Sequence, residues 1–253
     1  MTAGWIVYAA ATVLGELLLP LAPAATALLD AAVLVVALTH FGWAQRSPIA
    51  VGDPTIRVLP AVALVPLMRL LSLTLPVPDM APIFWIAFAT GPLLLAVVAS
   101  ARLAHMDVDQ LLLARLPADA LSLLVVAASL PAGIAVGILA PVRFDLATDS
   151  PLGLAFMAGF LVVGAAIPEE LVFRGLLQTL IADLVGGAAP VVVSAVFAST
   201  YVGTQSPLVV VVMGGIGLAY GLEVRRSGSL WPALAGHAVL LLASVFLAPL
   251  LRA

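Results

Sequence analysis

An eight-residue stretch, Pro168-Glu169-Glu170-Leu171-Val172-Phe173-Arg174-Gly175, places two adjacent carboxylates and an arginine in an otherwise apolar region. Residues 151–167 before it carry no charge. Inside a membrane each ionised group costs roughly 2.5–3.5 kcal/mol on insertion scales, so such a cluster needs partners or a function. On a helix, Glu170 and Arg174 are four residues apart and can pair, whereas Glu169 points about 100° away from Glu170. The pattern predicts one carboxylate neutralised by arginine and one free to face something else.

The composition around this stretch is that of a membrane protein. Of 253 residues, 64% are hydrophobic and 9% are charged, whereas soluble domains are nearer half apolar and a quarter charged. We therefore expect an all-α, polytopic integral membrane helix bundle in a lipid bilayer. The net charge is −3 and the charges are scattered, so no nucleic acid partner is expected. Arginine without lysine, together with abundant alanine, valine, leucine and glycine, indicates a bacterial protein of the inner (plasma) membrane.

Apolar runs separated by proline, glycine and polar residues predict eight or nine membrane spans. The expected helices cover about 4–20, 24–43, 58–75, 82–101, 120–142, 151–183, 189–203, 207–224 and 230–250. Residues 1–150 would supply about five of these helices and residues 151–253 the remainder, in one structural domain. We expect a turn at residues 76–79, a short interfacial helix within 102–119, and an interfacial aromatic belt of Phe84, Trp85 and Phe88.

Three further charged residues fall inside the predicted spans. Glu16 and Asp30 are expected to face the protein interior or to lie near helix ends. Arg69 is expected to pair, or to extend its side chain toward the water, near the end of its helix.

The arginines between the spans predict the orientation of the chain. Loops after the second, fourth and eighth helices hold six of them: Arg46, Arg57, Arg102, Arg115, Arg225 and Arg226. The loops on the other face hold only Arg143. The positive-inside rule then places the six-arginine face, and the N-terminus, in the cytoplasm. Glu169 and His237 would meet toward the cytoplasmic side of the membrane.

The C-terminal 90 residues resemble the CPBP family of type II CAAX prenyl endopeptidases and bacteriocin-immunity-like membrane proteins. The resemblance rests on the stretch quoted above and on Ser194-Ala-Val-Phe197, Gly214-Gly215, Gly217, Gly221, Ser227-Gly-Ser-Leu-Trp231-Pro232 and Gly236-His237. Order and spacing agree with the family, and the glycines are typical of close helix packing.

The resemblance implies a glutamate-type intramembrane peptidase that hydrolyses a peptide bond near the cytoplasmic membrane face. Glu169 would activate water and His237 would stabilise the oxyanion. Tyr201 occupies the position of a family histidine and completes the candidate catalytic set. Glu170, Arg174 and Phe197 would support it. No cofactor is implied, and no metal is expected because Glu169, Glu170 and His237 have no evident fourth ligand.

Two positions depart from the family pattern. Tyr201 replaces the histidine of the second motif, and Leu241 replaces the asparagine or aspartate that follows the third-motif histidine by four residues. A tyrosine hydroxyl can still donate a hydrogen bond to an oxyanion, but removing one such donor typically costs about 10²–10³ in rate. Activity is therefore expected to be weakened or lost.

The sequence leaves several functions open. The first is a peptidase that acts on a membrane peptide or protein substrate. The second is a pseudoenzyme that acts as a scaffold or as an accessory subunit of a membrane protein complex. A transporter has the least support, because no internal repeat or pair of broken helices is evident.

Overall fold

The computed structural model of the chain describes residues 4–47, 50, 52–75, 86–116, 119–140 and 150–251. Every regular element within these ranges is helical, which confirms the predicted all-α class. The longer helices are α1 (Gly4–Leu18), α2 (Pro23–Ala44), α5 (Leu64–Thr74), α7 (Gly91–Leu103), α8 (Ala120–Leu139), α9 (Pro151–Leu161), α11 (Gln178–Val185), α12 (Ala189–Ser199), α13 (Pro207–Ser227) and α14 (Trp231–Leu242). Shorter helical pieces connect or extend them: α3 (Pro54–Arg57), α4 (Leu59–Val62), α10 (Ile167–Glu170), and several π- and 3-10-helical turns.

Among the described residues, six helical segments are long and apolar enough to cross a membrane. They are Pro23–Ala44, Pro54–Thr74, Ala120–Leu139, Pro151–Thr204, Pro207–Ser227 and Trp231–Leu251. Gly4–Leu18 and Phe88–Leu103 are shorter apolar helices. The described part of the chain is thus all-helical with six candidate membrane spans, fewer than the eight or nine predicted, because two of the apolar helices are shorter than a span requires. The predicted turn at 76–79 and the aromatic residues Phe84 and Trp85 lie outside the described residues.

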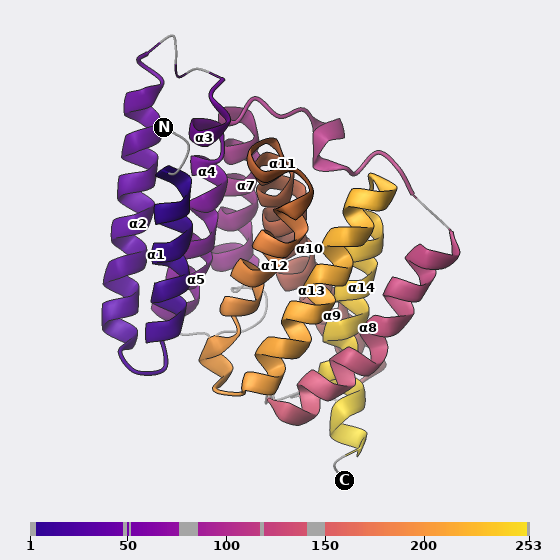
Figure 1. Cartoon of the computed structure of the whole chain (residues 1–253). Coiled ribbons are helices and arrows are strands. Elements are labelled where there is room, and N and C mark those ends of the chain that lie inside the picture. Colours follow the sequence, from indigo (N-terminus) through magenta and orange to yellow (C-terminus); the bar gives the residue numbers. More distant parts are fainter. Residues whose placement is uncertain are drawn as a thin grey trace.

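The helices alternate in direction through the bundle (Figure 1). Helices α1 and α2 form one edge, α8 and α14 lie at the other, and α10, α11 and α12 run between them. Helices α2, α7, α11 and α13 finish at one end of the bundle (Figure 1). Arg46 follows α2, and Arg102, Arg225 and Arg226 lie in the last turns of α7 and α13. We call this the arginine-rich end. Helices α1, α5, α12 and α14 run toward the opposite end.

A short helical element lies within 102–119, where the sequence predicts a short interfacial helix. It is a single 3-10 turn, Val108–Leu111, after which Leu112 adopts a left-handed conformation with φ 61°. The Leu112 carbonyl accepts a hydrogen bond from the Leu230 amide at 2.8 Å, and the Leu113 carbonyl accepts one from the Trp231 indole at 2.8 Å. The Leu112 and Leu113 carbonyls thus accept hydrogen bonds from Leu230 and Trp231, at the start of α14. In a longer helix these carbonyls would have accepted hydrogen bonds from amides of the same helix.

Close backbone approach explains several glycines. On α8, Gly133 and Gly137 lie against the Leu240 and Ser244 carbonyls of the last helix, so a side chain at either position would collide with backbone. On α13, a Cβ at Gly217 would lie 2.8 Å from the Arg174 guanidinium. Small residues let helices pack this closely in membranes.

The predicted close packing of the α13 glycines is largely confirmed. A Cβ at Gly214 would lie 3.3 Å from Ala198, and one at Gly221 would lie 2.7 Å from Gln178. Gly215 is the exception, since an added Cβ there would meet nothing within 4 Å.

An ion pair joins α8 to α13 at the arginine-rich end. Arg226 bonds both carboxylate oxygens of Asp119 at 2.8 Å, and Asp119 caps α8 by accepting from the Leu121 and Ser122 amides. The hydrogen bonds from Arg226 and from the capped amides hold the pKa of Asp119 at about 2. The folded-state pKa lies below the ordinary value, so this contribution is present above about pH 4 and is lost as pH falls toward 2.

We expect Asp119→Asn to lower the melting temperature at pH 7, because the variant loses the charged acceptor for Arg226, while its amide oxygen can still cap α8. The difference from wild type should shrink as the pH is lowered toward 2. Thermal unfolding of both proteins in detergent across pH 2–7 measures this. A difference that is independent of pH would contradict the assignment.

Candidate functional site

The charged stretch lies on a long helix that runs from α9 through α10 to α11. Pro168 has no N–H with which to bond the Gly164 carbonyl four residues before it. That carbonyl instead accepts a hydrogen bond from the Thr90 hydroxyl at 3.1 Å, which ties the helix to the start of α7. Turns of π-helix, Val162–Ala166 and Leu171–Leu177, flank α10 on both sides. Such turns are frequent at functional sites.

Glu170 and Arg174 form the predicted ion pair. Arg174 Nη1 lies 3.2 Å from Glu170 Oε1, and neither side chain is exposed. The same oxygen lies 2.8 Å from Nδ1 of His237 on α14. Glu170 thus joins the long helix to α14 through one carboxylate oxygen.

Arg174 also fastens the long helix to α12 and α13. Its Nη2 donates to the Gly217 carbonyl at 3.1 Å, and its guanidinium carbon lies 4.2 Å from the centre of the Phe197 ring. The absence of a side chain at Gly217 permits this approach. A buried arginine therefore meets a carboxylate, a carbonyl and an aromatic face, which together offset the loss of its hydration.

Glu169 has a different environment from Glu170. Its side chain is 22% exposed, whereas that of Glu170 is fully buried. The Tyr201 hydroxyl donates a hydrogen bond to Glu169 Oε2 at 3.3 Å, and His237 Nε2 lies 3.8 Å from the same oxygen. The structure thus separates the two carboxylates as the sequence predicted, with Glu170 paired and Glu169 facing open space.

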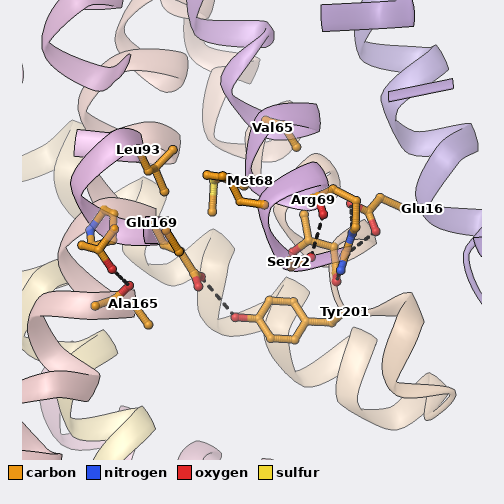
Figure 2. Close-up of a pocket in the computed structure, with 15 residues that line it drawn as sticks. Glu16, Val65, Met68, Arg69, Ser72, Leu93, Ala165, Glu169 and Tyr201 are labelled. Carbon is orange, nitrogen blue, oxygen red and sulfur yellow. Dashed lines mark hydrogen bonds and ion pairs between the residues drawn. The ribbon is translucent and has the colours of Figure 1, made fainter. Parts of the chain in front are cut away.

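That space is a pocket of about 220 Å³ beside Glu169. Figure 2 shows Tyr201 and Glu169 pointing toward each other at one side of the pocket, and Arg69 and Glu16 meeting at the other. The lining residues are Glu16, Val65, Met68, Arg69, Leu71, Ser72, Ala89, Thr90, Leu93, Gly164, Ala165, Pro168, Glu169, Thr200 and Tyr201. His237 is fully buried and is not among them, so it contacts Glu169 from behind rather than across the pocket.

Nine of the fifteen residues that line this pocket lie before position 151. Arg69 on α5 binds Glu16 on α1 through two hydrogen bonds, Nε to Oε1 at 3.0 Å and Nη2 to Oε2 at 2.5 Å. Its Nη2 also donates to the Thr200 carbonyl at 2.6 Å, next to Tyr201. The sequence predicted that Glu16 is interior and that Arg69 pairs, but not that the pair lines the site. The signal available in the sequence was that Glu16 and Arg69 are opposite charges within predicted membrane spans.

The pocket lies farther from the arginine-rich end than expected. Glu16 is two residues from the end of α1, Tyr201 follows α12, and Thr90 precedes α7. These positions all belong to the opposite end of the bundle (Figure 1). The pocket therefore extends from Glu169, near the middle of the bundle, toward the end with few arginines.

The structure brings together all six residues of the predicted site. Glu169, Glu170, Arg174, His237 and Tyr201 are joined by the contacts above, and Phe197 packs edge-on against Tyr201 with ring centres 5.3 Å apart. Their chemical roles stay predictions.

The sequence analysis missed one residue next to this group. Tyr220 is buried, its ring lies 6.3 Å from that of His237, and its hydroxyl bonds Ser129 of α8 at 2.8 Å. Within the described ranges, no three His, Cys, Asp or Glu side chains are grouped as a metal site requires.

Comparison with protein families matches residues 151–243 to the type II CAAX prenyl endopeptidase Rce1-like family. Residues 151–243 are a CPBP-family domain. This confirms the resemblance that the motifs suggested for the C-terminal part of the chain. Neither the curated proteins nor the solved structures include a match to the chain. The pocket is thus formed jointly by the CPBP domain and by α1, α5 and α7, which lie outside the matched region.

Proposed function

We propose that the chain is a CPBP-type intramembrane peptidase with weakened activity, in which Glu169 activates water at the pocket. One observation carries this proposal. Of the two adjacent carboxylates, only Glu169 lines the pocket, which extends beyond the family domain. Glu170 is instead paired with Arg174 and His237. A carboxylate at the wall of a largely apolar pocket is suited to general base catalysis.

The proposed reaction is hydrolysis of a peptide bond. Glu169 takes a proton from water as the water oxygen bonds to the carbonyl carbon of the substrate. The Tyr201 hydroxyl would donate a hydrogen bond to the oxyanion that forms. Glu169 then returns its proton to the amide nitrogen as the carbon–nitrogen bond breaks, which leaves a carboxylic acid and an amine. His237 would act through Glu169, since its ring touches Glu169 rather than the pocket.

The pocket also suggests where the substrate lies. If the arginine-rich end is cytoplasmic, as the positive-inside rule implies, the pocket opens from mid-membrane toward the other face. The bond that is cut would then lie deeper than the cytoplasmic surface site that the sequence suggested. Apolar walls formed by Val65, Met68 and Leu93 favour an apolar segment of a membrane peptide or protein.

A second candidate function is supported by the hydrogen bond from Tyr201 to Glu169. It occupies one of the oxygens that would activate water, and Leu241 supplies no polar group on α14. A family member without catalysis would use the same buried network to hold its helices in place. It would act as a scaffold or as an accessory subunit of a membrane protein complex.

The peptidase proposal predicts that Glu169→Gln abolishes cleavage while the protein remains folded. New N-termini of membrane proteins should be compared between cells that carry wild type and cells that carry this variant. Asp183→Asn is the matched control, because Asp183 is a half-exposed carboxylate on the same long helix. Peptides present in wild type and the control but absent in Glu169→Gln support catalysis. Identical N-termini in all three contradict it.

Extraction from native membranes in mild detergent separates the two candidates independently of the substrate. A particle of fixed composition that contains other membrane proteins, together with unchanged N-termini, supports the accessory subunit. A single chain or a simple homo-oligomer, with Glu169-dependent N-termini, supports the peptidase.

A further inference from the structure

Asp30 is a buried acid that the site described above does not use. It lies about two turns into α2, the residue is 1% exposed, and neither carboxyl oxygen has a hydrogen-bond partner. Its Oδ1 lies close to α1, at the backbone of Gly15, where an added Cβ would be only 3.1 Å away. A polar group in this position must be neutral or must find a partner.

The nearest positive charge is already matched. Arg69 binds both oxygens of Glu16 and the Thr200 carbonyl. Its single positive charge is therefore already neutralised by the Glu16 carboxylate. Asp30 would be a second negative charge in the same junction of α1, α2 and α5.

The other helices that pack against α2 bring little further charge. On α3, Arg57 bonds Asp183 and the Ala104 carbonyl. Helix α4 consists of Leu59–Val62 and is uncharged. Glu16 and Arg69 are thus the described charged groups that share this junction with Asp30 on its neighbouring helices.

The negative charge of an ionised Asp30 would have to be compensated within the junction. An ionised Asp30 would be a buried anion without a cation or a hydrogen bond, which is among the costliest arrangements within a membrane. A bound cation would need several oxygen ligands, and the Gly15 carbonyl nearby already accepts a hydrogen bond from the Thr26 hydroxyl. A proton removes the charge without further ligands.

We propose that Asp30 binds a proton in the folded protein, so that the junction of α1, α2 and α5 is a proton-binding site. Glu16 belongs both to this junction and to the pocket wall, which places the proton site next to the pocket and outside the CPBP domain. The proposal does not depend on whether the pocket catalyses hydrolysis.

Two amide substitutions test this in the full-length protein in detergent at pH 7. Asp30→Asn replaces a protonated acid with a neutral group of the same shape, and should unfold within about 2 °C of wild type. Glu16→Gln is the matched control in the same junction, because it removes an ionised partner of Arg69. It should lower the melting temperature by about 6 °C or more. An Asp30→Asn loss as large as that of Glu16→Gln would overturn the proposal.

Infrared difference spectroscopy detects the proton directly. We expect a carbonyl-stretch band of a protonated carboxylic acid at pH 7 that disappears in Asp30→Asn and persists in Asp183→Asn. Persistence of the whole band in Asp30→Asn would contradict the proposal. Melting of wild type in choline, sodium and potassium chloride provides the last comparison. Stabilisation by sodium or potassium that Asp30→Asn removes would show a cation in place of the proton.

Discussion

Replacing Arg174 by methionine is expected to lower the free energy of unfolding by about 3–5 kcal/mol. The substitution keeps an unbranched side chain of similar length but removes the cation that faces Glu170. Glu170 is fully buried and has one oxygen without any partner, so it would lose the main compensation for its charge. The Gly217 carbonyl and the Phe197 ring would also lose their contacts with the guanidinium.

Chemical denaturation in mixed micelles measures this loss. Arg102→Met is the matched control, since Arg102 is exposed at the end of α7 and should tolerate the change within about 0.5 kcal/mol. In the double variant Glu170→Gln with Arg174→Met, the buried anion is removed together with its cation. The double variant should therefore be more stable than Arg174→Met alone. Equal stability of Arg174→Met and Arg102→Met would mean that the pair contributes nothing to the fold.

Restoring the two family residues is expected to raise peptide cleavage by about 10²–10³-fold. The variant is Tyr201→His combined with Leu241→Asn. Tyr201 now occupies one oxygen of Glu169 with its hydroxyl at 3.3 Å. A histidine reaches less far, which frees that oxygen for water, and an asparagine on α14 adds a donor where Leu241 has none.

The N-termini of membrane proteins report this gain, as they do for the wild-type activity. Tyr201→Phe with Leu241→Met keeps the apolar volume and supplies no polar group, so it serves as the control. Adding Glu169→Gln to the restored variant should cancel the gain. A folded restored variant without new N-termini would show that the two substitutions are not what limits catalysis, and a gain that survives Glu169→Gln would exclude Glu169 as the base.

Residues close together in the chain made much of this protein predictable. Apolar runs and proline breaks located the helices, because hydropathy and helix length act locally; α8, for example, begins at Ala120 as expected. The pairing of Glu170 with Arg174 follows from a spacing of four residues on one helix. The motif sequence also indicated the family and the six residues of the candidate site.

The extent of the short helix within 102–119 could not be predicted from residues close together in the chain. Its backbone carbonyls at Leu112 and Leu113 bond Leu230 and Trp231, which lie more than a hundred residues later. Local polarity predicted a short helix, and partners from a distant part of the chain limit it to one 3-10 turn. Tertiary contacts overrode the local preference because they satisfied the same hydrogen-bonding groups.

The amino-acid sequence alone determined that this chain is helical with long apolar segments, that residues 151–243 form a CPBP domain, and that Glu170 but not Glu169 pairs with Arg174. Only the tertiary structure decided what faces Glu169. The pocket joins Glu16, Arg69 and Thr200, which are separated by 53 and 131 residues, and it leaves His237 behind Glu169 rather than across from it. The identity of such partners depends on how separate helices pack, and buried charges restrict that packing without specifying which charges meet.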